Sequence, residues 1–139
     1  MIQSLRAWFR GAPPEGKALG RAGERLAARE LRRRRYRLMA RNLTVAPGEA
    51  DLVFTAPDGR TLVIVEVKTR LATDHPGAIR PEANIDAAKR RKLVQVARAV
   101  VARLGAQDRP LRIDVVAIDW RPGGRHSVRH YENAVTDTR

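Results

Sequence analysis

The chain has 139 residues, of which 43% are apolar, so one domain with a real hydrophobic core is expected. It has no cysteine, which excludes a disulfide scaffold and a thiolate zinc site, and no apolar run approaches the ~18 residues of a membrane span. The formal net charge of +13 favours a polyanionic partner, and the expected location is cytoplasmic.

The positive charge is concentrated towards the N-terminus, where residues 1–47 carry 12 Lys and Arg against 3 Asp and Glu. Nucleic acid is the expected partner, because each phosphate that a Lys or Arg neutralises releases counterions. The alternatives are a solvated Arg-rich surface and attraction to anionic membranes. Aromatic residues make up only 4% of the chain, which argues against a module that binds single strands by stacking bases.

The N-terminal part predicts a tail followed by a helix. Residues 1–16 are expected to form the tail, 17–135 the domain and 136–139 a C-terminal tail. The helix is predicted from about Gly16 to Arg37, and the run of arginines near its end suits the negative end of the helix dipole. Spacings of four, three and four residues place four positions on one face of this helix, namely Gly20, Glu24, Ala27 and Leu31.

The rest of the chain alternates strands and one helix. Strands are predicted at about Ala50–Thr55 and Thr61–Thr69, because an Asp-Gly pair between apolar runs is a strong hairpin signal. A loop over 71–84, a helix from about Asp86 to Leu104, and strands at Leu111–Asp119 and Ser127–Glu132 follow. This order predicts an α/β fold, with helices flanking a mixed β-sheet in a single domain.

Charged residues interrupt the apolar pattern of the predicted hairpin. Glu66 and Lys68 are two residues apart, so they share one strand face with Leu62 and Ile64, and a carboxylate placed there needs a nearby cation. If Asp58-Gly59 is a two-residue turn, Asp51 lies directly opposite Glu66, with the side chains roughly 5 Å apart. A shift of one residue in the register would separate the two carboxylates onto opposite faces.

Two carboxylates this close repel each other, and a divalent cation that bridges them compensates this repulsion. Oxygen ligands without neighbouring His or Cys suit a hard ion, so Mg²⁺ or Mn²⁺ is the expected cofactor. Such an ion can activate water for phosphodiester cleavage, and Lys68 is placed to orient that water or stabilise developing charge. The alternative is a cross-strand ion pair of Asp51 or Glu66 with Lys68 in an ordinary sheet.

Two ordered motifs frame the predicted hairpin, Gly48-Glu49-Ala50-Asp51-Leu52-Val53 and Val65-Glu66-Val67-Lys68-Thr69-Arg70. Together they resemble the core of the YraN-like family of uncharacterised bacterial proteins. Further matches are Gly23-Glu24, Asn42, Lys89 to Leu93, Arg112-Ile113-Asp114-Val115 and His130-Tyr131-Glu132-Asn133-Ala134, so the resemblance covers roughly residues 18–134. Ala50 and Ile113 depart from the family pattern.

The resemblance implies a restriction-endonuclease-like fold of the PD-(D/E)xK type, related to archaeal Holliday junction resolvases. It makes Asp51 and Glu66 metal ligands, Lys68 the catalytic lysine, and Glu24 a further catalytic and metal-binding residue from the first helix. Glu24 could instead form ion pairs with exposed arginines, and Glu49 could be either a ligand or a rim residue.

Basic residues at the start of the second helix support contact with nucleic acid. Cations are unfavourable at a helix N-terminus unless an anion such as phosphate gathers there, although a solvated face with Asp86 as compensation is an alternative. The expected nucleic-acid-binding residues are Lys89, Arg90, Arg91, Lys92, Arg70, Arg33 and Arg34. None of His75, His126 and His130 is expected to bind metal; surface or hydrogen-bonding roles suit them better.

These features together predict a metal-dependent endonuclease that cleaves DNA, with branched or junction structures as candidate substrates. A DNA- or RNA-binding protein without catalytic activity is the main alternative, and an adaptor with incidental charge is a third. Symmetric cutting of a four-way junction would require two copies of the site, so a homodimer stays open as a partner.

Overall fold

The computed structural model describes residues 16–71 and 85–136 of the chain. Its elements in chain order are α2 (Gly16–Arg33), β1 (Arg37–Val45), β2 (Gly48–Thr55), β3 (Leu62–Leu71), α3 (Ala87–Leu104), β4 (Leu111–Trp120), a short 3-10 helix η2 (Pro122–Gly124) and β5 (His126–Val135). Residues 1–15, 72–84 and 137–139 lie outside the described residues, and with them nearly all of the tail expected over 1–16 and of the loop expected over 71–84. Of these two segments only Gly16, the first residue of α2, and Leu71, the last residue of β3, are described.

The five strands form one sheet in the order β1-β2-β3-β4-β5. Neighbouring strands are antiparallel except β3 and β4, which are parallel. A parallel pair needs a crossover connection, and the segment between these strands includes α3. The chain is therefore a single α/β domain built on a mixed sheet, as its sequence predicts.

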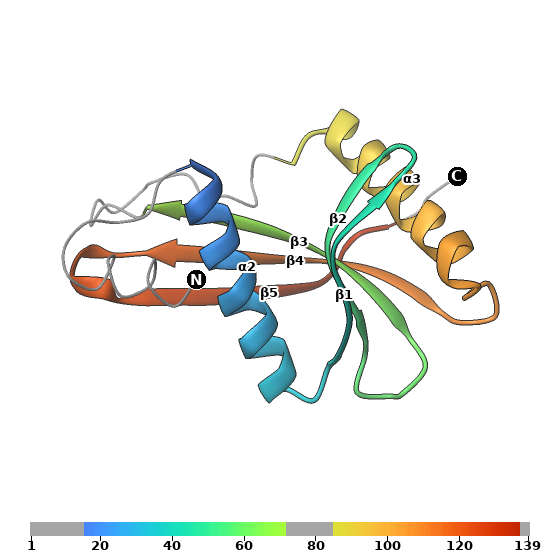
Figure 1. Ribbon diagram of the computed structural model, residues 1–139, viewed down its shortest axis with the longest axis horizontal. Coiled ribbons are helices and arrows are strands. Elements are labelled where there is room, and N and C mark those ends of the chain that lie inside the picture. Colours follow the sequence, from blue (N-terminus) through green and yellow to red (C-terminus); the bar gives the residue numbers. More distant parts are fainter. Residues whose placement is uncertain (1–15, 72–84, 137–139) are drawn as a thin grey trace.

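Alternating apolar residues give the sheet two buried faces. On one face, α2 packs through Ala27 and Leu31 against Phe54 and the neighbouring strands. On the other face, α3 packs through Leu93 against Ile64. Figure 1 shows α2 crossing in front of β3, β4 and β5, while α3 lies beside the hairpin of β1 and β2. Neither helix of the described part of the chain is long and apolar enough to cross a lipid bilayer.

The first helix is shorter than predicted. It ends at Arg33 rather than Arg37, because Arg35 adopts the left-handed conformation, with φ 70°. The Tyr36 N–H then donates to the Leu31 carbonyl at 3.0 Å, and the Arg35 N–H to the Arg32 carbonyl at 3.0 Å. This is the Schellman ending, in which glycine usually occupies the left-handed position. With arginine there, the end of the helix leaves little sign in the sequence.

Strand β1 was not predicted. It is an edge strand with mostly exposed or half-buried residues, so its sequence Arg-Leu-Met-Ala-Arg-Asn-Leu-Thr-Val lacks a clear apolar alternation. The predicted helix Asp86–Leu104 is confirmed as α3, with Asp86 as N-cap and Gly105 in the left-handed conformation at its end. Its buried stripe includes Val96, whereas Leu104 at its end is 38% exposed.

Candidate active site

The register of β2 and β3 is the one predicted, although the turn is wider. The paired residues include Leu52 with Val65 and Thr55 with Leu62. Ala56 donates its N–H to Thr61, which leaves a four-residue loop in place of a two-residue turn. One extra residue on each side keeps the register unchanged, so Asp51 still falls opposite Glu66.

Asp58 holds this wider turn together. Its Oδ1 accepts hydrogen bonds of 2.8 Å from the backbone N–H groups of both Arg60 and Thr61, and the Thr61 hydroxyl donates to its Oδ2. The hydrogen bonds from Thr61 and then Arg60 lower the pKa of Asp58 to about 2. Because Pro57 has no N–H to donate, the tight two-residue turn is replaced by this side-chain-capped loop.

The two strands part at the predicted pair of carboxylates. Strand β2 leaves β3 beyond Leu52 and continues beside β1, while β3 continues beside β4 as far as Leu71. At this fork the Asp51 Oδ2 accepts a hydrogen bond of 2.9 Å from the Val67 N–H, a donor that the β2 backbone no longer satisfies. In Figure 1 the tip of the β1–β2 hairpin bends towards α3, away from β3, β4 and β5.

Glu66 lies in the fork with its side chain only 12% exposed. Burial raises its pKa to about 7, and the neighbouring charge of Asp51 and a hydrogen bond with it act in the same direction. Lys89 and Lys68 lower the pKa, and the Lys89 Nζ lies 3.6 Å from the Glu66 Oε1. The pair of carboxyls therefore readily retains a proton near neutral pH when no other cation is present.

Helix α2 approaches this fork because Gly23 has no side chain. A Cβ at this position would lie 1.8 Å from the Thr69 Oγ1 on β3, so only glycine lets the helix pack this closely. The next residue, Glu24, is thereby brought near Asp51 and Glu49. Burial raises the pKa of Glu24, and the charges of Asp51 and Glu49 raise it further. Glu24 is half-buried at this place, and its metal-binding role stays a prediction.

Asn42 joins the acidic residues of α2 and β2. With its side-chain amide nitrogen towards them, Asn42 donates to Glu24 Oε1 at 2.9 Å and to Glu49 Oε1 at 3.1 Å. Its backbone has φ 48°, a left-handed conformation that asparagine tolerates better than most residues. Backbone strain of this kind is often found where a side chain must be aimed at a functional site.

The arrangement has the chemistry of a site for a hard cation, but not its finished geometry. Within residues 16–71 and 85–136, no three side chains of Asp, Glu or His lie together closely enough to form a preformed metal centre. The carboxyls of Asp51 and Glu66 are hydrogen-bonded to each other, while Glu24 is bound by Asn42. All the candidate donors are oxygens, which Mg²⁺ and Mn²⁺ prefer. The predicted metal roles stay predictions.

The expected nucleic-acid-binding residues occupy separate places. Lys89 lies at the carboxylates, and Asp86 caps the same helix, accepting from the Lys89 N–H at 2.8 Å. Arg90 lines a cavity of about 510 Å³ beside β5. Arg70 pairs with the buried Asp119 at 3.1 Å. The remaining residues are exposed and belong to α3 or to the end of α2, namely Arg91, Lys92, Arg33 and Arg34.

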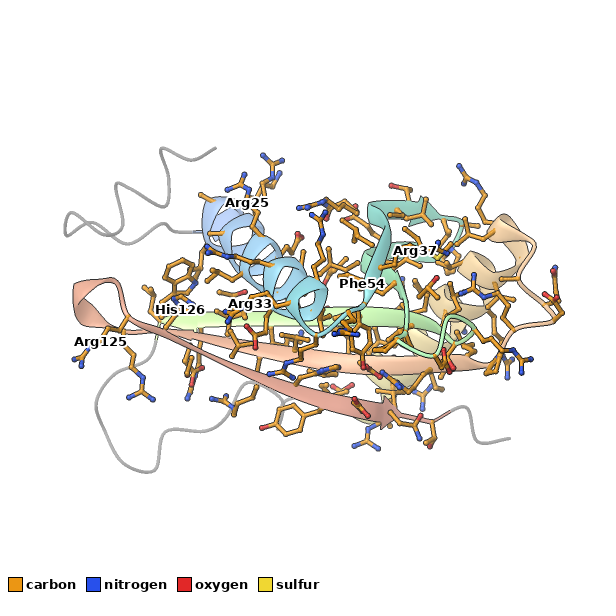
Figure 2. All side chains as sticks on the ribbon, turned by 90° about the horizontal axis from the view of Figure 1, so that it is seen from below. Arg25, Arg33, Arg37, Phe54, Arg125 and His126 are labelled. Atoms are coloured by element: carbon orange, nitrogen blue, oxygen red, sulfur yellow. The ribbon has the colours of Figure 1, made fainter. Side chains whose placement is uncertain are left out.

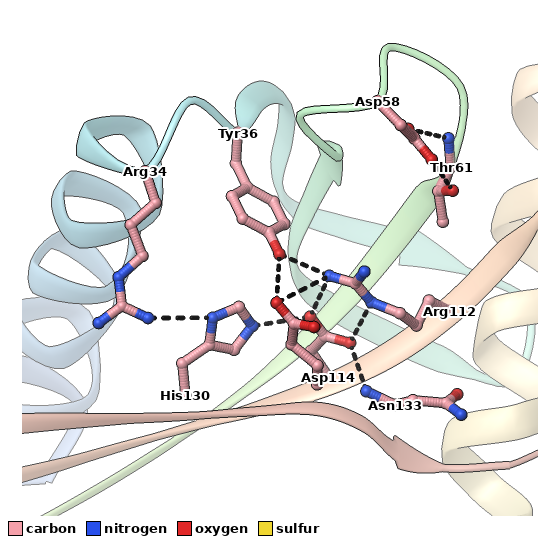
Figure 3. A network of polar contacts seen from close by, with 9 residues as sticks. Arg34, Tyr36, Asp58, Thr61, Arg112, Asp114, His130 and Asn133 are labelled. Atoms are coloured by element: carbon pink, nitrogen blue, oxygen red, sulfur yellow. Dashed lines mark hydrogen bonds and ion pairs between the residues drawn. The ribbon is translucent and has the colours of Figure 1, made fainter.

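A second polar network, on the α2 side of the sheet, was not predicted as such. Asp114 on β4 is fully buried, and its carboxylate accepts from Arg112 Nε at 2.9 Å and from the Asn133 N–H at 2.9 Å. The His130 Nε2 lies 2.7 Å from Asp114 Oδ2, and Arg112 also donates to the Tyr36 hydroxyl (Figure 3). Burial opposes ionisation of Asp114, but the hydrogen bonds from His130 and Arg112 outweigh it and lower the pKa.

This network links β4, β5 and the segment between α2 and β1, so its first role is to hold these elements together. The sequence signal was a charged pair, Arg112 and Asp114, within an otherwise apolar strand. The hydrogen-bonding role expected for His130 is confirmed. His126 lies beside Trp120, with ring centroids 5.8 Å apart, and His75 lies outside the described residues.

Among solved structures, the chain is similar to SfsA of Pyrococcus furiosus in complex with Ca²⁺, with a TM-score of 0.37 and 16% identity. The match covers 82% of this chain, and the chain spans 62% of the length of that protein. A likeness of this size bears on neither the fold nor the function.

Comparison of sequences is more informative. A UPF0102 protein of Symbiobacterium thermophilum is 42% identical over 118 residues, covering 85% of this chain and 96% of that protein. A UPF0102 protein of Geobacter sulfurreducens is 41% identical over 118 residues, covering 85% of this chain and 88% of that protein. Residues 23–118 also match the family described as "Uncharacterised protein family UPF0102". The chain belongs to this family, the YraN-like family that its motifs resemble.

Proposed function

We propose that this protein is a metal-dependent nuclease whose active site is the fork between β2 and β3. The observation that carries the proposal is the pairing of the Asp51 and Glu66 carboxyls, with the pKa of Glu66 raised to about 7 by burial and then by Asp51. Keeping two carboxyls together in a half-buried place costs stability. A bound divalent cation would relieve that cost by replacing the shared proton.

Asp51 and Glu66 would hold the ion, with Glu24 as a further ligand from α2. The bound Mg²⁺ or Mn²⁺ would polarise the scissile phosphate and lower the pKa of a water molecule. Asn42 orients Glu24 through its hydrogen bond and so acts as a positioning residue. Glu49, which also binds Asn42, is exposed and suits a rim position better than a place in the centre.

Lys68 would act on the reacting atoms. It shares the α3 face of β3 with Glu66, two residues along the strand, and its positive charge lowers the pKa of Glu66. A lysine in this position can orient the attacking water and stabilise the charge that develops on the phosphate. Lys89 contacts Glu66 directly and is freed to bind a phosphate once the carboxylate binds the ion.

The proposed substrate is DNA, cleaved at its phosphodiester bonds in the cytoplasm, with branched or junction structures as candidates. Support comes from the net charge of +13 and from the basic residues beside the carboxylates at the start of α3. A restriction-endonuclease-like, PD-(D/E)xK identity is part of this proposal. Cutting a junction symmetrically would require a homodimer.

Cleavage assays test the proposal directly. Labelled single-stranded, duplex, flapped and four-way-junction DNA would be incubated with Mg²⁺, Mn²⁺ or EDTA. The Glu66→Ala/Lys68→Ala double variant would be compared with Asp108→Ala/Arg98→Ala, which also removes one acid and one base but lies outside the fork. Metal-dependent products lost only in the first variant would support the nuclease. Products that survive in it would reject this site.

A DNA- or RNA-binding protein without catalysis is the second candidate. One observation favours it: the described residues hold no preformed group of three metal-binding side chains. In that case none of the substrates would be cut, and salt-sensitive binding would be equal for the wild type and the Glu66→Ala/Lys68→Ala variant.

A further inference from the structure

A groove lined by arginines runs along α2 and β1 and begins at Glu24 and Asn42. Its first part is a hollow of about 480 Å³, lined among others by Glu24, Asn42, Arg21, Arg25 and Arg41. Its second part is a hollow of about 710 Å³, lined by Arg25, Arg29, Arg32, Arg33 and Arg41. Arg25 and Arg41 belong to both linings, so the two hollows form one groove, which we call the α2–β1 groove.

The arginines follow from the helical repeat. Arg21, Arg25, Arg29 and Arg32 are spaced four, four and three residues apart, so they lie along one side of α2. The buried face of the same helix carries small and apolar residues such as Ala28 and Leu31. Figure 2 labels two of the arginines of α2, Arg25 near the middle of the helix and Arg33 at its end.

Three arginines of this groove, Arg29, Arg32 and Arg41, lie beyond Glu24 and form no ion pair with the described residues that would balance their charge. Glu30 is the one acidic residue in the second half of α2, and it pairs with Arg33 at 3.8 Å and Arg34 at 3.0 Å. Within the described residues, no ion pair joins Arg29, Arg32 or Arg41 to a carboxylate. Like charges at helical spacing repel each other and destabilise a helix. An anionic ligand along the groove would remove this repulsion.

We propose that the α2–β1 groove binds the phosphodiester backbone of a nucleic-acid strand and leads it to the carboxylates at the fork. From Arg21 to Arg32 the helix rises roughly 16 Å at 1.5 Å per residue. That length spans about five nucleotides of one strand at 3.4 Å each. That the strand leads to the carboxylates rests on the proposed nuclease function; binding of the strand in the groove does not.

The chemistry of the lining sets the mode of binding. The second hollow is lined by arginines, with no aromatic side chain among them. Guanidinium groups bind phosphate through paired N–H donors, whereas bases are recognised mainly by stacking or by contacts with their edges. Binding in the groove is therefore independent of base sequence and strongly dependent on salt.

The test compares two triple variants that lose the same charge. Arg29→Gln/Arg32→Gln/Arg41→Gln alters the groove, and Arg98→Gln/Arg121→Gln/Arg125→Gln alters exposed residues elsewhere. Binding of a labelled single-stranded or duplex oligonucleotide is measured by fluorescence anisotropy in EDTA at several salt concentrations. All six side chains are exposed, and equal unfolding midpoints would show that both variants fold.

The groove variant is expected to reduce the slope of log K against log salt by about 2 to 3, at 0.7–0.9 per lost phosphate contact. The control variant should leave the slope nearly unchanged. If both variants lose the same amount of binding, net charge alone matters and the groove proposal is overturned. If neither variant loses binding, the groove proposal is overturned as well. Loss of binding to phosphatidylserine vesicles, with oligonucleotide binding retained, would overturn it in favour of a membrane partner.

Cross-linking gives an independent measurement, because the natural chain has no cysteine. Ala18→Cys in the groove is expected to react with an oligonucleotide that carries a thiol-reactive group on its backbone. Ala102→Cys, exposed on α3, is expected not to react. Equal reaction at both positions would overturn the groove. Binding in the groove needs no metal, so the two proposals can fail separately. If the groove variant weakens binding but no DNA is cleaved, only the nuclease proposal is overturned. If DNA is cleaved but the groove variant binds as the wild type does, only the groove proposal is overturned.

Discussion

Replacing Glu66 by Gln should remove a large part of the pH dependence of stability. The pKa of Glu66 is raised from 4.5 to about 7, chiefly by burial and then by the charge of Asp51. In the unfolded chain this carboxyl ionises near its ordinary pKa, so between pH 4.5 and 7 the folded state binds more protons than the unfolded state. The stability due to Glu66 is therefore full below pH 4.5 and is lost as the pH rises towards 7.

The size of this loss follows from the shift. A pKa raised from 4.5 to about 7, at 1.36 kcal/mol per unit, corresponds to roughly 3 kcal/mol. Glu66→Gln keeps the shape of the side chain and cannot ionise. As the pH rises above 4.5, the unfolding free energy of the variant should therefore fall by about this amount less than that of the wild type. At pH 8 the variant should be the more stable protein, whereas near pH 4.5 the two proteins should be similar.

Urea unfolding followed by circular dichroism at pH values from 4 to 8 would measure the difference. Asp108→Asn, which removes an exposed carboxylate from the turn after α3, is the matched control and should follow the wild type. Parallel curves for the wild type and Glu66→Gln would refute the reasoning, since another group would then be responsible for the titration.

Three further predictions concern packing, the second network and catalysis. Gly23→Ala should destabilise the protein by about 1–3 kcal/mol in urea unfolding, because its Cβ would meet Thr69, whereas Gly20→Ala, with open space around it, should stabilise by up to about 1 kcal/mol. Asp114→Asn should lower the free energy of unfolding by about 3–5 kcal/mol, because Arg112 loses its buried partner. Acidification of the wild type through the lowered pKa of Asp114 should remove the same contribution. An unchanged urea midpoint would contradict this. Lys68→Ala should reduce cleavage by about 10²–10³-fold in a single-turnover assay while DNA binding is kept, and unchanged cleavage would remove Lys68 from the mechanism.

The pairing of Asp51 with Glu66 could be predicted because a hairpin register depends on little more than the position of its turn. The predicted turn was too tight, yet the wider loop closed by Asp58 adds one residue to each side and leaves the pairing unaltered. The parting of the strands just beyond Leu52 was not predictable in this way. It depends on the packing of the β1–β2 hairpin against α3, which involves residues far apart in the sequence.

Glu24 could be placed on the inner face of its helix from the spacing of Gly20 and Leu31, but its environment could not. The close approach of α2 depends on Gly23 meeting Thr69, and the orientation of Glu24 depends on Asn42 in an unusual backbone conformation. Neither contact leaves a periodic pattern in the sequence. Strand β1, which carries Asn42, was itself missed because an exposed edge strand needs little apolar alternation.

Direct titration of Mn²⁺ into the protein tests the central claim, that the Asp51 and Glu66 carboxyls form a metal site. Calorimetry would compare the wild type with Asp51→Asn, Glu66→Gln and the control Asp108→Asn between pH 6 and 8. We expect binding that strengthens as the pH rises towards 7 and releases about one proton in acidic buffer, because the ion displaces the proton that the pair retains. Asp51→Asn and Glu66→Gln should each abolish this binding, while the control should not. Binding that is absent from the wild type, or equal in all four proteins, would contradict the claim.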